Sequence, residues 1–269
     1  MSGRFFQTLA EEVRTHGRLA MATVVNAVGS TPRETTARML VLPSGETRFT
    51  IGGGRFEALV LEDARRLLAD GGLPFTRDYA FVPEGEDSFG AVCGGRATVL
   101  LEVVEKAPRL LVVGAGHCGR ALARAAAFTG YEVTVVDDRA ERLEPSAFPE
   151  GVRLAAIGPG AEELPLPEPG DAVALVSRGH ATDGAALRRL RGVPVAYLGM
   201  IGSAAKRKAL YDALRAEGWS EDELRRVSSP IGLDIGARTP EEIAIAIVAQ
   251  LIASRRLGDR DTRAGSSSP

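Results

Sequence analysis

The stretch RLLVVGAGHCGRALARAAAFTGYEVTVVDDR, residues 109–139, decides the fold of the second half of the chain. An apolar strand at 109–113 leads into a glycine-rich run at 114–119, and helical sequence follows at 121–128. A second apolar strand at 131–136 ends beside Asp137. Strand, glycine-rich turn, helix and strand in this order predict the first part of a Rossmann-type unit with parallel strands.

The glycine-rich run matches the pattern G-x-G-x-x-G, with Gly114, Gly116 and Gly119 at the fixed positions. Glycines there allow a tight turn and a close backbone approach, and the amino end of the following helix favours a phosphate. Asp137 falls where an acid can bind ribose hydroxyls. We therefore expect NAD(P) or another adenine nucleotide, although a turn that binds nothing would have the same sequence. Arg139 could reach a 2′-phosphate, so NAD and NADP both stay open.

The sequence after residue 139 extends this unit, with further strands expected at 152–157, 172–176 and 193–198. Asp183 is expected to cap a helix at 184–191, and Ser203 a helix running to Glu217. Ser220 with Glu223, and Thr239 with Glu242, have the spacing of capping boxes.

The first half has a different pattern. A helix is expected before Gly17, and strands at 19–28, 38–42 and 47–51. A helical apolar stripe at 56–68 follows, and then strands at 75–82 and 96–104. Pro108 marks the boundary. The fold class predicted is α/β: a C-terminal Rossmann-like parallel sheet with helices on both faces, after a smaller α+β domain. We expect two domains, at 1–105 and 109–257, and a disordered tail at 258–269.

Composition excludes several classes of protein. The chain has 269 residues, 45% of them hydrophobic and 25% charged, which is typical of an ordinary globular protein. A net charge of −2 without a dense basic block argues against nucleic acid as a partner. Two cysteines are too few for a secreted disulfide scaffold, so we expect a cytoplasmic protein. We also expect no membrane span, because no apolar run reaches the length that a bilayer requires.

Short motifs in both halves resemble the XdhC/CoxI family. They occur in the family's order over roughly residues 20–255. The motifs are GSTPR at 29–33, TIGGG at 50–54 with Glu57, CGG at 93–95, GAGHCG at 114–119, VVDDR at 135–139, GH at 179–180 with Asp183, GMIGS at 199–203, PIGL at 230–233 and TPEEIA at 239–244.

This resemblance implies an accessory factor, a cofactor-maturation chaperone more than a free-standing catalyst. It would bind molybdenum cofactor (molybdopterin), promote its sulfuration with a cysteine desulfurase, and help insert it into xanthine dehydrogenase or a related molybdenum hydroxylase. The protein could also form a homodimer. The alternatives are an NAD(P)-dependent oxidoreductase, which the same glycine pattern would suit, and a nucleotide-sensing regulatory protein.

Three residues are candidates for chemistry. Cys93, flanked by glycines, could contact sulfur or the molybdenum of the cofactor, because a thiolate is a soft ligand and a strong nucleophile. The alternative is a small packed residue. His117 and His180 are expected in loops at the carboxyl edge of the parallel sheet, where they could donate to a phosphate or pterin, or act as acid or base. A hydrogen-bonded structural histidine is the alternative for each.

Further candidates for cofactor contacts lie on loops. Gly202 with Ser203 forms a second glycine turn before a basic helix start, which could hold an anion or be a simple helix cap. Arg33 and Glu57 are candidate ligand contacts, with a surface arginine and a helix-dipole carboxylate as alternatives. The triple glycine supplies another candidate phosphate loop: Gly52, Gly53 and Gly54.

Overall fold

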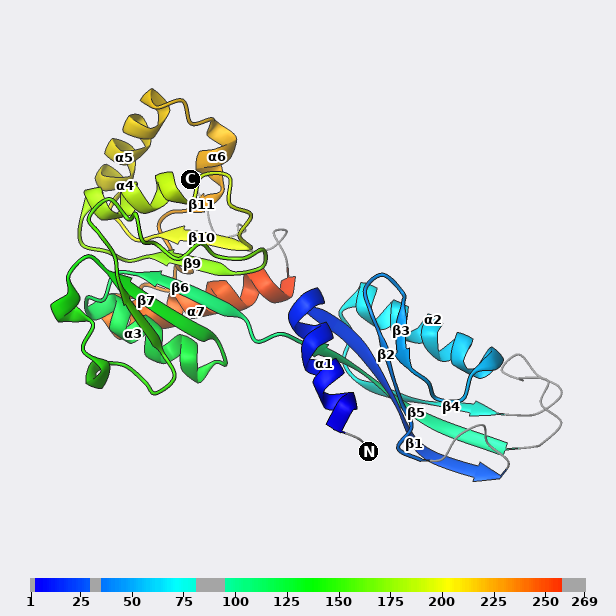
Figure 1. Cartoon of the computed structure of the whole chain (residues 1–269). Coiled ribbons are helices and arrows are strands. Elements are labelled where there is room, and N and C mark those ends of the chain that lie inside the picture. The colour runs from blue at the N-terminus through cyan, green and yellow to red at the C-terminus, as the bar shows by residue number, and fades with distance from the viewer. Residues whose placement is uncertain (1–2, 30–34, 81–94, 258–269) are drawn as a thin grey trace. The chain divides into compact units, whose positions relative to one another are not determined.

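The computed structural model describes residues 3–29, 35–80 and 95–257, except for the side chain of His180 (Figure 1). The chain divides into two compact units, Met1–Lys106 and Ala107–Pro269. Each unit has its own hydrophobic core.

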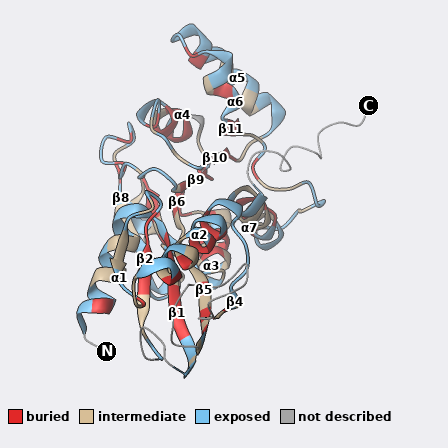
Figure 2. Cartoon of the chain, turned by 90° about the vertical axis from the view of Figure 1, so that its right-hand side faces the viewer, coloured by how far each residue is buried: buried red, intermediate tan, exposed pale blue. Residues whose placement is uncertain are grey.

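The first unit is an antiparallel sheet of five strands in the order β3-β2-β1-β5-β4. The strands are β1 (Arg18–Gly29), β2 (Arg38–Val41), β3 (Thr47–Phe49), β4 (Phe75–Ala80) and β5 (Gly95–Glu105). Helix α2 (Gly54–Asp70) packs its apolar stripe, which includes Phe56 and Val60, on one face. Helix α1 (Gly3–His16) places Phe5 against Leu19 and Leu40 in a second, smaller cluster. Figure 2 shows buried residues gathered along β1.

The second unit is a parallel sheet of six strands in the order β11-β10-β9-β6-β7-β8. The strands are β6 (Arg109–Val113), β7 (Glu132–Asp137), β8 (Arg153–Ala156), β9 (Ala172–Leu175), β10 (Tyr197–Met200) and β11 (Val227–Ser228). The chain starts in the middle with β6, proceeds to one edge, and returns to the other edge from β9. This is the Rossmann order, and its direction reverses between β6 and β9.

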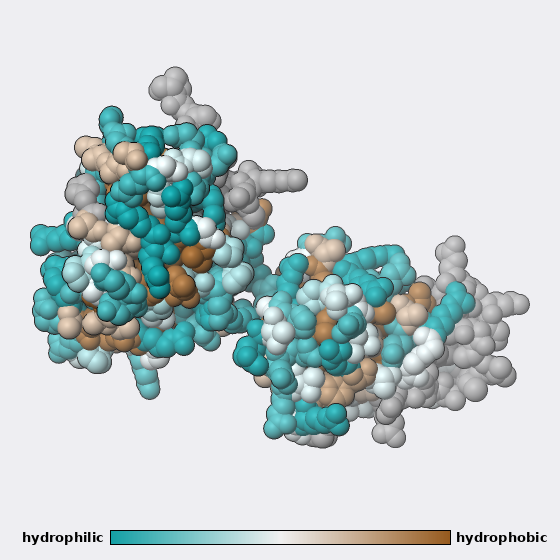
Figure 3. Space-filling view, turned by 45° about the horizontal axis from the view of Figure 1, so that its top comes forward, coloured by the Kyte–Doolittle hydropathy of each residue, from teal (hydrophilic) through white to brown (hydrophobic). Residues whose placement is uncertain are grey.

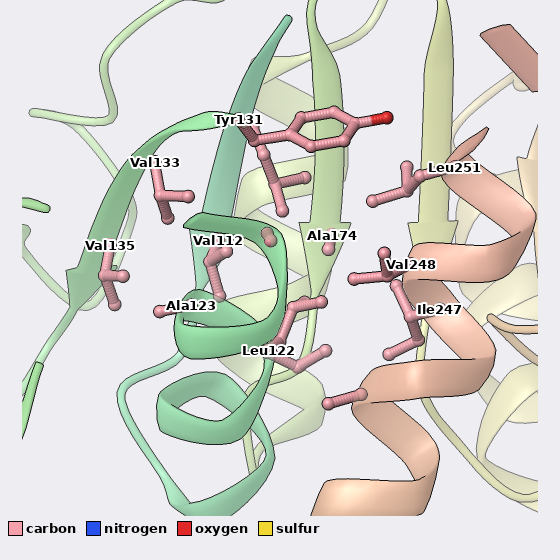
Figure 4. Packing of buried hydrophobic residues seen from close by; sticks show 14 of the residues in the cluster. Val112, Leu122, Ala123, Tyr131, Val133, Val135, Ala174, Ile247, Val248 and Leu251 are labelled. Atoms are coloured by element: carbon pink, nitrogen blue, oxygen red, sulfur yellow. The ribbon is translucent and has the colours of Figure 1, made fainter. Parts of the chain in front are cut away.

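Helices cover both faces of this parallel sheet, as the sequence predicts. Helix α3 (His117–Phe128) and helix α7 (Pro240–Leu257) pack on one face, where Leu122, Ile247 and Val248 lie over the same strands (Figure 4). Helix α4 (His180–Arg189), helix α5 (Ala204–Ala216) and the short α6 (Glu221–Arg225) cover the other face through Leu187 and Leu214. Each fully buried leucine of this kind contributes on the order of 1.5–3 kcal/mol. The predicted fold class is confirmed.

Most local predictions hold, and the capping chemistry explains why. Ser220 and Glu223 form the predicted capping box of α6, and Thr239 and Glu242 bind each other's backbone N–H groups at the start of α7. Ser203 caps α5 by accepting a hydrogen bond from the Lys206 N–H at 3.2 Å.

Three local predictions need correction. Helix α3 begins at His117, not at residue 121, because Gly116 is its N-cap. Helix α4 begins at His180, so Asp183 lies inside it and does not cap it. The strand expected at 193–198 is β10, which starts only at Tyr197 because turn hydrogen bonds hold the chain at Val193 and Val195. Both candidate histidines therefore start helices and do not lie in loops.

The face of each unit seen in the space-filling view (Figure 3) is mostly hydrophilic. Figure 3 shows hydrophilic residues over most of the visible face of each unit, with apolar residues in small scattered groups. Among the residues that the structure describes, no helix combines the length and the apolar character that crossing a membrane requires.

Candidate functional site

A cavity of about 330 Å³ opens at the carboxyl edge of the parallel sheet. Its walls come mainly from the segments that follow β6, β7 and β9, and therefore from the point where the strand order reverses. Ile201 after β10 and Pro240 at the start of α7 complete them. Open α/β sheets bind ligands at this position. The lining residues are Gly114, Gly116, His117, Cys118, Asp137, Arg139, Arg142, Val176, Ser177, Arg178, Ile201 and Pro240.

The three glycines of the loop have different physical roles. A Cβ on Gly119 would lie 1.8 Å from the carbonyl oxygen of Gly114, so only glycine lets α3 approach β6 this closely. Gly114 has a φ of +118°, and a Cβ there would lie 2.8 Å from the backbone of Ser177. A Cβ on Gly116 would meet only the Arg142 Nη1 atom, at 3.5 Å. The fold therefore requires Gly114 and Gly119, whereas Gly116 leaves space on the cavity side.

Asp137 is hydrogen-bonded within the protein. Its side chain is 2% exposed, and one carboxylate oxygen accepts the Ala115 N–H at 2.6 Å. The other oxygen accepts from Arg139 twice, from the backbone N–H at 3.0 Å and from Nε at 3.2 Å. Burial alone would raise the pKa of Asp137, but these hydrogen bonds outweigh it and hold the pKa below its ordinary value. The carboxylate thus fixes the glycine-rich loop to the end of β7.

Two further carboxylates fix α4. Asp138 accepts a hydrogen bond from the Thr182 hydroxyl at 2.9 Å. Asp183 is fully buried and binds the Ser177 hydroxyl at 2.5 Å and the Lys206 ammonium at 2.6 Å. Burial raises the pKa of Asp183 although Lys206 and Ser177 oppose the rise. The Asp138 contact joins the end of β7 to α4, and the Asp183 contacts join α4 to the end of β9 and to the first turn of α5.

The polar groups left to face the cavity are mainly cationic or hydrogen-bond donors. Arg142 and Arg178 make no side-chain hydrogen bond or ion pair with another described residue, and Arg178 is exposed. Arg139 uses its Nε on Asp137. His117 is exposed in the first turn of α3, whose N-cap Gly116 supplies no side-chain acceptor. Free N–H groups at a helix start and guanidinium groups together bind anions well.

Cys118 also lines this cavity, although its position in the glycine loop suggests only packing. Burial and then the nearby Glu241 carboxylate raise its pKa, which keeps it a protonated thiol at neutral pH. Sequence reasoning missed Arg142, Ser177 and Arg178 as lining residues, because nothing in the local pattern marks them.

Two of the other predicted sites are engaged in their own loops. Glu57 accepts hydrogen bonds from the N–H groups of Ile51 and Gly53, at 3.2 and 3.1 Å, and from the Thr50 hydroxyl. It therefore holds the loop in which Gly52, Gly53 and Gly54 all have positive φ. Gly202 and Ser203 form the cap of α5, whose basic first turn is internally paired: Lys206 with Asp183, Arg207 with the Ser229 carbonyl, and Lys208 with Asp212.

Three of the predicted site residues are not tested by these contacts. Cys93 and Arg33 lie outside the described residues, and so does the side chain of His180. Within the described ranges, no group of three or more His, Cys, Asp or Glu side chains could hold a metal ion.

A second cavity, of about 520 Å³, lies against the starts of β6 and β8. Two arginines line it. Arg109, the less exposed of the two, is neutralised by Asp171 through two hydrogen bonds of 2.8 Å, and by Glu168 at 2.6 Å. Arg153 pairs with Glu132 at 3.9 Å. The paired charges leave little field for an anion there. The smaller cavity at the carboxyl edge is therefore the better candidate site.

Strand order, glycine loop and cavity define a protein with a Rossmann-type ligand-binding domain. The XdhC Rossmann domain model matches residues 110–251, and the XdhC and CoxI family model matches residues 13–80. The chain belongs to the XdhC and CoxI family, which confirms the resemblance seen in its motifs.

Relatives support this membership. The uncharacterized protein YqeB of Escherichia coli K12 is 36% identical over 236 residues, which cover 87% of this chain and 43% of that protein. A probable xanthine dehydrogenase subunit from Bacillus subtilis is 33% identical over 162 residues, 59% of this chain and 46% of that protein. The chain thus spans less than half the length of either relative. A crystal structure from Bacillus halodurans, described as a xanthine dehydrogenase, superposes with a TM-score of 0.53 and 22% identity over 98% of this chain and 97% of that one, which supports the fold.

Proposed function

We propose that this protein is an accessory factor that binds molybdenum cofactor and promotes its sulfuration and insertion into xanthine dehydrogenase or a related molybdenum hydroxylase. Family membership, together with a relative named as part of a xanthine dehydrogenase, supports the hydroxylase as client. The observation that carries cofactor binding is the cationic cavity at the carboxyl edge of the Rossmann sheet.

The residues of that cavity fit the phosphate end of the cofactor. Gly116 gives a ligand access to the backbone, and Arg142 and His117 can donate hydrogen bonds to phosphate oxygens. When bound, the cofactor would supply the molybdenum chemistry that the client requires. Cys93 stays a prediction for the sulfur or molybdenum contact, since a thiolate suits both roles.

An NAD(P)-dependent oxidoreductase is the alternative, because the glycine loop would suit a dinucleotide. Arginine and histidine supply the ionisable donors along the described cavity walls, and neither lysine nor tyrosine lines them. This donor set favours holding an anion over the Lys or Tyr/Lys arrangement that a hydride-transfer site would use. We therefore expect little dehydrogenase turnover by the protein alone.

Co-expression with the molybdenum cofactor pathway tests the proposal. The purified protein should carry molybdenum and release fluorescent pterin oxidation products, and it should reactivate a cofactor-free hydroxylase when a cysteine desulfurase is present. Protein that carries no pterin and gives no reactivation would contradict the proposal. Robust NAD(P)H production from a small substrate would favour the oxidoreductase instead. The desulfurase contact and a homodimer stay predictions that pull-down and light scattering can check.

A further inference from the structure

Three aspartates at the carboxyl edge of the Rossmann sheet are engaged by the protein itself, while Glu241 lies near Cys118. Asp137 holds the glycine-rich loop, Asp138 holds Thr182, and Asp183 holds Ser177 and Lys206. A ribose needs an accessible acceptor for its hydroxyl groups. Asp137, the residue in the ribose-binding position, is 2% exposed and already accepts three N–H hydrogen bonds. Asp137 is therefore poorly placed to bind the ribose hydroxyls of a dinucleotide.

Two arginine side chains at the same edge are not paired with other described residues. Arg142 and Arg178 face the cavity without a partner among the described residues, and Arg142 Nη1 lies 3.5 Å from the position of a Cβ on Gly116. The guanidinium is thus next to the open backbone of the glycine loop. Arg178 comes from the turn after β9, on another wall of the cavity. Two guanidinium groups and a glycine loop suit a small, highly charged anion.

We propose that this cavity is a phosphomonoester site, in which Arg142 and Arg178 bind a terminal phosphate at the glycine loop while Asp137 only positions that loop. The inference rests on the proposed function in naming a phosphorylated pterin as the ligand. A phosphomonoester carries close to two negative charges at neutral pH and three acceptor oxygens, and the two arginine forks can donate to all of them. The two phosphates inside NAD form a pyrophosphate with one negative charge on each phosphoryl group, so NAD lacks the group recognised here.

A pair of matched ligands tests the proposal. The fluorescent oxidised pterin derived from molybdopterin keeps the phosphate, and phosphatase treatment removes it without changing the ring. Fluorescence anisotropy with the full chain should show binding that is at least 10-fold tighter for the phosphorylated pterin, because removing one charge-assisted hydrogen bond corresponds to about a 10-fold to 100-fold change. Equal affinities, or no binding of either pterin, would overturn the assignment of a phosphorylated pterin as the ligand.

Two arginine variants show whether these residues recognise the phosphate. R142Q and R178Q should each weaken the phosphorylated pterin about 10-fold or more and leave the dephosphorylated pterin unchanged. Arg189, exposed on α4 and outside the cavity, gives the matched control R189Q, which should bind both pterins as the wild type does. Loss of affinity for both pterins alike would reduce the arginines to a structural role and overturn the assignment.

Protection of Cys118 reports the location of binding. Its thiol lines the same cavity, so the phosphorylated pterin should slow alkylation of Cys118, measured by mass spectrometry of its peptide. Tight pterin binding without protection would place the phosphate elsewhere and overturn the site.

Adenosine 5′-monophosphate, with adenosine as its pair, separates the sources of the phosphate. Discrimination by this pair but not by the pterins would support a phosphomonoester site and contradict the proposed function. If R142Q and R178Q leave pterin loading and hydroxylase reactivation unchanged, the proposed function stands and the phosphomonoester site is contradicted.

Discussion

Replacing Gly116 or Gly119 by alanine separates ligand binding from folding within one four-residue segment. Gly116 has a φ of −72° and a ψ of −171°, which any L-residue adopts. A methyl group there meets only Arg142 Nη1, at an ordinary contact distance of 3.5 Å. The free protein should tolerate G116A, with a free energy of unfolding within about 1 kcal/mol of the wild type, because the lower entropy of the unfolded chain and the poorer N-cap preference of alanine oppose each other.

Gly119 lies in helical backbone, but its new methyl group would lie 1.8 Å from the Gly114 carbonyl oxygen. Because the atom in the way belongs to the backbone, α3 and β6 would have to separate. We expect G119A to destabilise the protein by roughly 3 kcal/mol or more, at or above the usual range for overpacking.

Urea unfolding and binding of the phosphorylated pterin should be measured on both variants. G116A should unfold like the wild type and bind at least about 10-fold more weakly, because its methyl group occupies the space between the loop and Arg142. G119A should unfold at a lower urea concentration than the wild type. A G116A variant that binds normally would show that no ligand approaches this backbone, and a stable G119A would refute the packing argument.

Two further predictions concern ion pairs. Lys206→Met leaves the buried Asp183 carboxylate without its ammonium partner and should lower the free energy of unfolding by about 3–5 kcal/mol. Lys208→Met, at an exposed ion pair, is the control and should change it by less than about 0.5 kcal/mol. Similar losses for the two variants would contradict the argument. Hydrogen bonds, first from Arg191, lower the pKa of Glu223 from 4.5 to about 2. Its stabilisation is therefore present above about pH 4.5 and lost as the pH falls toward 2. The stability difference between Glu223→Gln and wild type, measured by urea unfolding, should shrink between pH 7 and pH 3; a constant difference would exclude this linkage.

Local chemistry made much of the fold predictable. The capping boxes at Ser220 and Thr239 involve residues three apart, so the sequence contains both partners of each contact. The glycine loop between two apolar strands likewise identifies a Rossmann unit, because its steric requirement at Gly119 is met within a few residues. The sequence does not locate helix starts that have a glycine N-cap, such as that of α3, because glycine has no side chain that could signal a cap.

The sequence by itself determined the parallel sheet, the glycine loop and the family, since these depend on short-range periodicity and motif spacing. Only the tertiary structure decided which charges face the cavity. Asp138 finds Thr182 44 positions away, and Asp183 finds Lys206 23 positions away. Arg142 and Arg178 reach one cavity from separate turns. The sequence does not show which charged side chains are already paired in the folded protein. A carboxylate whose oxygens already accept hydrogen bonds from the protein binds a ligand poorly, whereas an unpaired guanidinium can donate to one.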